Sequence, residues 1–216
     1  MKLLLDHGAN PNPNKKPETE SSPLLEGITA GDAAIVEMLI QRGADARAAG
    51  QIGLTTAVAE NCARCVDLLA AKITDKAVYT GSLQDTAVYG DIKSVRLMID
   101  HGADVTGYDP LGRTPLMYAA VSDLLPLDVV ELLIDRGADV NAKDRHTLTG
   151  NAGLTVLDIA KLNGDTPVAQ LLVKSGAKAS PVTPAVLKPR RDPGQHSSVA
   201  TRRCQFFYQI WLHFLS

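Results

Sequence analysis

The sequence predicts an all-α fold, a solenoid in which helix-turn-helix repeats stack side by side. First, a phrase made of an apolar pair, two polar residues and Gly-Ala recurs along the chain. Second, another phrase, clearest in residues 112–120, lies upstream in the same phase. Third, only 4% of the 216 residues are aromatic, which favours thin aliphatic layers over one large irregular core. Copies of the first phrase occupy residues 4–10, 39–45, 98–104, 133–139 and 172–178, with a degenerate copy at 69–75.

The elements of one repeat follow from its residues, most clearly between 105 and 139. Thr114 can cap a first helix, and Pro115 suits its first turn, where no intrahelical N–H bond is lost. The largely apolar stretch 129–134 predicts a second helix. Gly137 fits the left-handed residue that ends a helix. Gly-Asp pairs, which predict a turn and a capped second helix, stand at 31–32, 90–91 and 164–165.

Thr-Pro-Leu at 114–116, Gly-Asp at 90–91 and Leu-Ile-Asp-Arg-Gly-Ala-Asp at 133–139 resemble the ankyrin repeat, as does a spacing near 33 residues. The resemblance covers about residues 1–178. It implies antiparallel helix pairs with a projecting finger in each repeat, stacked into an elongated, curved slab. Repeat 5 matches best; repeat 3 matches worst, because Gly53 and Ile73 replace the expected Pro and Gly. The repeats are a partial repeat 1 at 1–13, then repeats 2 to 6 at 14–45, 46–75, 76–104, 105–139 and 140–178.

Both ends depart from the repeat pattern. Met1 falls inside what should be a second helix, so we expect either a fragment or a translation start farther upstream. Residues 179–204 are rich in Pro, Lys and Arg, which predicts an extended, basic linker. Residues 205–216 form an aromatic hydrophobic tail with three open interpretations. It is the truncated stump of a further domain or an accidental end, a cap on the last repeat, or a segment that lies on an anionic membrane.

Charge and hydropathy argue against nucleic-acid binding, membrane insertion and secretion. The formal net charge of -2 gives no support for nucleic-acid binding. No run approaches the roughly 18 apolar residues of a transmembrane helix, and the apolar start of the chain is too short for a signal peptide. We therefore expect a cytoplasmic chain with no nucleic-acid partner, and we also expect a monomer. Membrane contact is kept only as an alternative for the tail.

The candidate chemical motifs do not form a recognisable reactive site. Cys62 and Cys65 make a C-x-x-C motif without a second pair or a thioredoxin-like context. In repeat phase Cys65 takes a buried aliphatic position, so we expect free thiols that pack as small hydrophobes. The five histidines lack metal-ligand spacing, and neither a phosphate loop nor a nucleophilic serine motif is present. We predict no catalytic, cofactor or metal site, and a chain that is not an enzyme.

The resemblance implies a non-catalytic scaffold that binds another protein on the concave face formed by the fingers and first helices. Aromatic and Arg side chains contribute most to interfaces, so Tyr89, Tyr108 and Arg113 are the preferred anchors. Two alternatives are a regulatory module of a larger enzyme or redox protein, and a peripheral membrane adaptor that acts through the tail. The predicted partner-facing residues are Thr29, Ala30, Glu60, Val88, Tyr89, Leu111, Arg113, Val121, Ser122 and Leu162, with Tyr108 and Arg145 from the fingers.

Overall fold

The computed structural model describes residues 2–13, 22–89, 91–121, 127–145, 153–162 and 164–181. Helices make up most of these residues, and the extended pairing within them is one isolated antiparallel bridge between Lys143 and Thr155. The predicted all-α class is confirmed. The helices are α1 Lys2–Asp6, α2 Pro23–Thr29, α3 Ala33–Gln41, α4 Ala46–Ala59, α5 Ala63–Ala70, α6 Lys76–Tyr89, α7 Ile92–Asp100, α8 Pro115–Val121, α9 Leu127–Asp135, α10 Val156–Lys161 and α11 Pro167–Lys174.

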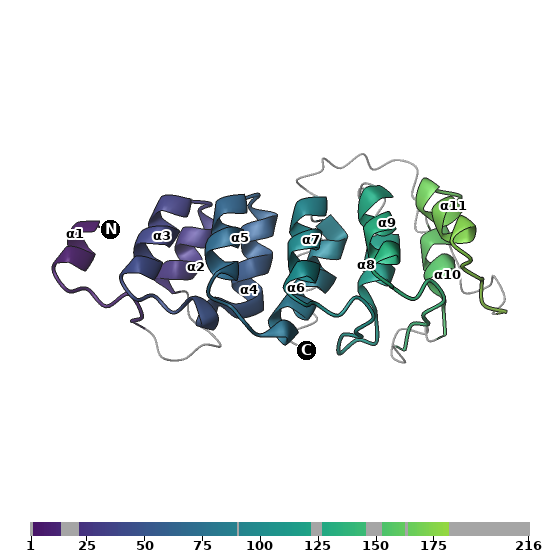
Figure 1. Cartoon of the computed structure of the whole chain (residues 1–216), viewed down its shortest axis with the longest axis horizontal. Helices are drawn as coiled ribbons and strands as arrows, with labels where there is room; N and C mark the ends of the chain where they lie inside the picture. The colour runs from purple at the N-terminus through teal and green to yellow at the C-terminus, as the bar shows by residue number, and fades with distance from the viewer. Residues whose placement is uncertain are drawn as a thin grey trace.

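The helices from α2 onward stand in two rows, with one helix of each repeat in each row (Figure 1). The first row is α2, α4, α6, α8 and α10, and each of these helices contacts the next one in the row. The second row is α3, α5, α7, α9 and α11, and each packs on the first-row helix of its own repeat. Because a repeat is held mainly by its neighbours, the apolar layer extends along the stack.

One position of the recurring phrase supplies the centre of this layer in repeats 2 to 6. A fully buried aliphatic side chain contributes roughly 1.5–3 kcal/mol, so its return at a fixed phase favours the same packing in each repeat. The first residue of the phrase is 0% exposed in all five of these copies: Leu39, Leu69, Met98, Leu133 and Leu172.

The turns use the chemistry that the sequence predicts. Asp32 and Asp91 cap α3 and α7, and each carboxylate accepts two backbone N–H groups from the first helical turn. Gly102 and Gly137 end α7 and α9 with φ of +89° and +93°. That left-handed conformation strains any residue with a Cβ, so glycine is the natural choice there.

The expectation of a projecting finger in every repeat is wrong for repeats 3 and 4. In repeat 4 the chain enters the first helix at once, and α6 has 14 residues. In repeat 3 a helical turn at residues 46–49 takes the place of the finger, and Gly50 separates it from the rest of α4. Residues 46–49 are Ala and Arg, which are strong helix formers, and the Asp45 side chain caps them. Gly50, with φ 49° and ψ -139°, kinks α4 after this extra turn.

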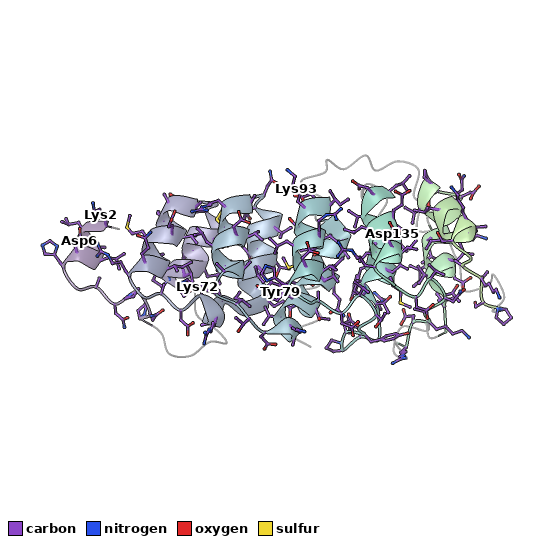
Figure 2. The ribbon with its side chains drawn as sticks, viewed as in Figure 1. Lys2, Asp6, Lys72, Tyr79, Lys93 and Asp135 are labelled. Atoms are coloured by element: carbon purple, nitrogen blue, oxygen red, sulfur yellow. A yellow bond between two sulfur atoms is a disulfide. The ribbon has the colours of Figure 1, made fainter. Side chains whose placement is uncertain are left out.

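The end of repeat 3 is closed by a side chain from repeat 4. Ile73 stands where other repeats have glycine, and carbonyl groups at the end of α5 need partners. The buried hydroxyl of Tyr79 donates to the carbonyl oxygens of Ala70 and Ile73, at 3.1 and 2.9 Å. The Tyr79 ring, labelled in Figure 2, also stacks on His101 with centroids 4.7 Å apart. This packing stabilises the repeat that matches the pattern least well.

Asparagine side chains tie neighbouring repeats together toward both ends of the stack. Asn12 donates to the carbonyl oxygen of Gly43 at 2.8 Å and accepts the N–H of Asp45 at 2.9 Å. Asn141 makes the same pair of contacts: it donates to the carbonyl oxygen of Gly176 and accepts the backbone N–H of Lys178. These bonds fix the spacing between adjacent repeats.

Candidate functional site

The fingers of repeats 5 and 6 are joined by a backbone hydrogen bond. The N–H of Arg145 donates to the carbonyl oxygen of Gly112 at 2.9 Å. Gly112 has φ +77°, and a Cβ built on it would lie 2.7 Å from the Cβ of Arg145. Within the finger of repeat 5, the Asp109 carboxylate accepts the N–H of Arg113 at 2.8 Å. The two fingers therefore form one unit, which we call the paired fingers (residues 105–114 and 143–145).

A buried carboxylate anchors Arg113 on the paired fingers. The side chain of Asp144 is 1% exposed and accepts a hydrogen bond from Nε of Arg113 at 3.3 Å, while the Arg113 side chain is 28% exposed. The Asp144 N–H also donates to the carbonyl oxygen of Leu154 at 2.8 Å. Buried charges are stabilised by paired, hydrogen-bonded partners, so this contact restricts the guanidinium of Arg113.

A second arginine is held by an aromatic ring. The guanidinium carbon of Arg145 lies 3.5 Å from the ring centroid of Tyr108, well within the range of a cation–π interaction. Arg145 is exposed, Tyr108 is half-buried, and Leu111 on the same finger is 39% exposed. Residues of two repeats thus present a cation, an aromatic ring and an aliphatic side chain together.

The first-row helices add polar side chains near the paired fingers. The hydroxyl of Tyr118 donates to the Asp109 carboxylate at 2.5 Å, and Gln51 donates to Asp85 at 2.9 Å. Burial raises the pKa of Tyr118, and the hydrogen bond to Asp109 raises it further. Burial also raises the pKa of Asp85; the bond from Gln51 opposes this effect, and the charge of Asp109 adds to it. The face is therefore polar as well as aromatic.

The structure divides the predicted partner-facing residues into two groups. Four of them, Tyr108, Leu111, Arg113 and Arg145, lie on the paired fingers. Six others lie at the carboxyl ends of first-row helices, which are the ends away from the fingers (Figure 1). These six are Thr29, Ala30, Glu60, Val88, Val121 and Leu162. Ser122 and the side chain of Tyr89 lie outside the described residues.

Four further residues of this face were not predicted from the sequence: Asp85, Asp109, Tyr118 and Asp144. Two of them could have been found from the repeat pattern. Asp85 and Tyr118 occupy the same repeat position on adjacent first helices, so they are expected to lie on the same face. No comparable signal exists for Asp144, since acidic residues are rarely buried and its burial depends on the partner that the fold provides.

The expectation of free thiols at Cys62 and Cys65 is wrong, because the two sulfur atoms are joined in a disulfide. Both residues are buried, as repeat phase predicts for Cys65. A spacing of three residues at a helix start brings the side chains together whether or not they bond, so the motif alone left the oxidation state open.

The described ranges contain neither a metal-binding cluster nor a membrane-spanning helix. There, no group of three or more His, Cys, Asp or Glu side chains is placed to hold a metal ion. In the same ranges, no helix combines the length and apolar character needed to cross a membrane. Residues 182–216 lie outside them, so the tail at 205–216 and nearly all of the linker at 179–204 stay as predictions.

Comparison with known proteins agrees with this architecture. A family model for ankyrin repeats in three copies matches residues 57–144, which include the disulfide and all of the paired fingers except Arg145. The chain is 30% identical over 179 residues to Ankyrin repeat and KH domain-containing protein mask-1 of Caenorhabditis elegans. The match covers 82% of this chain and 6% of that relative, so the chain spans a small part of the relative's length. Together, the recurring phrases, the two helix rows and these two matches show that the chain is an ankyrin repeat protein.

Proposed function

We propose that this chain is a non-catalytic scaffold that binds another protein on the face formed by its fingers and first-row helices. Ankyrin repeats generally mediate protein–protein interactions. The observation that carries the proposal is the fixed display of Arg113 and Arg145 on the paired fingers. The proposal includes a monomeric, cytoplasmic chain, and the net charge of -2 favours a protein over a nucleic acid as partner.

The paired fingers suit this role because their long side chains are already restricted. Immobilising a rotamer-rich side chain at an interface costs about 0.5–1.5 kcal/mol. Asp144 restricts Arg113, and Tyr108 restricts Arg145, so much of that cost falls on folding rather than on binding. Arg and Tyr are also enriched among the residues that dominate interface energy. We place the centre of the contact here, with the carboxyl ends of the first-row helices at its edge.

Photo-crosslinking tests the location of the contact. A photoreactive amino acid replaces Leu111 on the finger in one chain and Val173 on α11 in another, since these side chains are 39% and 53% exposed. We expect a partner protein to crosslink from position 111 and not from position 173. Crosslinking of the same partner from position 173 alone contradicts the proposed face.

A matched pair of arginine variants tests the energetics. Arg145→Ala removes the cation held on Tyr108, whereas Arg136→Ala removes an arginine whose partner is Asp100 in the second helix row. An interface residue of the dominant kind contributes about 2 kcal/mol or more, so Arg145→Ala should weaken partner binding at least about tenfold. Arg136→Ala should leave the affinity unchanged. Equal affinities for Arg145→Ala and the native chain, measured by calorimetry with the crosslinked partner, contradict the proposal.

A further inference from the structure

The disulfide lies at the turn between α4 and α5, in the repeat that matches the family pattern least well. Cys62 is the N-cap of α5, and its sulfur accepts the N–H of Cys65 at 3.2 Å. Cys62 is 8% exposed and Cys65 is 0% exposed, while Asn61 and Ala63 on either side of Cys62 are exposed. Asn61 has φ +56°, close to the +64° of Gly31 at the same turn of repeat 2. The pair therefore lies directly beneath an exposed turn.

The same position in two other repeats carries a permanent cap. Asp32 and Asp91 each accept two N–H groups in the first turn of their helices. Cys62 accepts one N–H, and its covalent bond to Cys65 closes the same turn. A carboxylate cap contains no bond that a thiol can break, whereas thiols can open a disulfide. Repeat 3 has this cysteine pair where the other two repeats have Asp. The start of α5 is therefore sensitive to the redox state of its surroundings.

We propose that Cys62 and Cys65 form a reversible dithiol–disulfide pair, a redox modification site that sets how firmly α5 is held in repeat 3. The reductant is a thiol of the glutathione or thioredoxin class. Its thiolate attacks Sγ of Cys62, the more exposed residue of the pair, and forms a mixed disulfide. The bond between the two cysteines breaks, and Cys65 leaves as a thiolate that takes up a proton.

A second thiolate completes the reduction. It attacks the reductant sulfur of the mixed disulfide, so Cys62 leaves as a thiolate and the reductant departs as its own disulfide. Two electrons pass from the reductant to the protein sulfurs. Glutathione disulfide drives the reverse reaction, in which Cys62 attacks first. The N-terminus of α5 and the N–H of Cys65 favour the Cys62 thiolate, and Cys65 stands one turn away to close the bond.

The third cysteine is removed for the test, because Cys204 would also react. The intact chain with Cys204→Ser is treated without denaturant, first with dithiothreitol and then with glutathione disulfide, and free thiols are alkylated and counted by mass spectrometry. We expect two alkyl groups after the first treatment and none after the second. Hydrogen exchange of α5 amides should be about tenfold faster in the reduced chain, with α9 unchanged.

The control replaces Cys62 by the cap that the other repeats use. Cys62→Asp in the same Cys204→Ser chain should show α5 exchange that is independent of dithiothreitol. Any one of three results overturns the proposal: alkylation only in denaturant, failure to reoxidise, or equal α5 exchange in the two redox states. None of these results bears on the partner face of repeats 5 and 6, whose proposed role is tested separately.

Discussion

Gly112→Ala is a direct test of the paired fingers. The new Cβ would lie 2.7 Å from the Cβ and 2.9 Å from the carbonyl carbon of Arg145, so the Arg145 backbone has to move. The left-handed φ of +77° costs alanine about 1–2 kcal/mol. Loss of the bond from the Arg145 N–H adds about 0.5–1.5 kcal/mol, and loss of the stacking on Tyr108 adds about 0.5–1 kcal/mol. We expect a destabilisation of about 2–4.5 kcal/mol in total.

Gly137→Ala is the matched control for backbone strain alone. Gly137 has φ +93°, and a Cβ there would meet nothing within 4 Å. Its expected cost is therefore about 1–2 kcal/mol. Urea unfolding followed by circular dichroism measures both free energies of unfolding. If the two losses agree within about 0.5 kcal/mol, the contact between the fingers contributes little and the argument for a pre-ordered Arg145 is refuted.

Two further predictions concern the stack itself. Leu133→Ala, at a 0% exposed position, should cost about 2–5 kcal/mol in urea unfolding, whereas Val173→Ala, at 53% exposure, should change stability by less than about 0.5 kcal/mol. Burial disfavours the charged form of Asp158, but hydrogen bonds from Thr155 and Ser180 outweigh it and lower the Asp158 pKa. The contribution of Asp158 to the free energy of unfolding is therefore complete above the pKa that this carboxyl has in the unfolded chain. It is lost as the pH falls through the lower pKa of the folded chain. Asp158→Asn should therefore flatten the decline of the urea midpoint below about pH 4, and an unchanged decline contradicts this account.

Local chemistry explains why much of the fold is predictable from the sequence. A glycine such as Gly137 and a capping residue such as Asp91 act within one turn of chain, so their roles can be recognised without knowing what packs around them. The buried phrase position at Leu133 follows from phase, because neighbouring repeats bury equivalent side chains.

Features that depend on contacts between repeats were harder to predict. The helical starts of α4 and α6 could have been inferred from helix propensity, at least for residues 46–49, but the family pattern favoured a finger there. The contact of Tyr108 with Arg145 depends on how two fingers meet across 37 positions of sequence, and no local rule specifies that geometry. The bond between Cys62 and Cys65 depends on oxidation as well as on proximity.

The contrast between helical starts in repeats 3 and 4 and fingers in repeats 5 and 6 has an evolutionary consequence. An inserted residue rotates the following part of a helix by about 100°, which would turn the buried side chains of α4 or α6 out of their layer. A loop at the tip of a finger absorbs the same insertion without disturbing the stack. Changes in length can therefore accumulate on the fingers while α4 and α6 keep their 14 residues. Divergent copies of this chain should acquire new binding preferences by remodelling repeats 5 and 6 around a conserved middle.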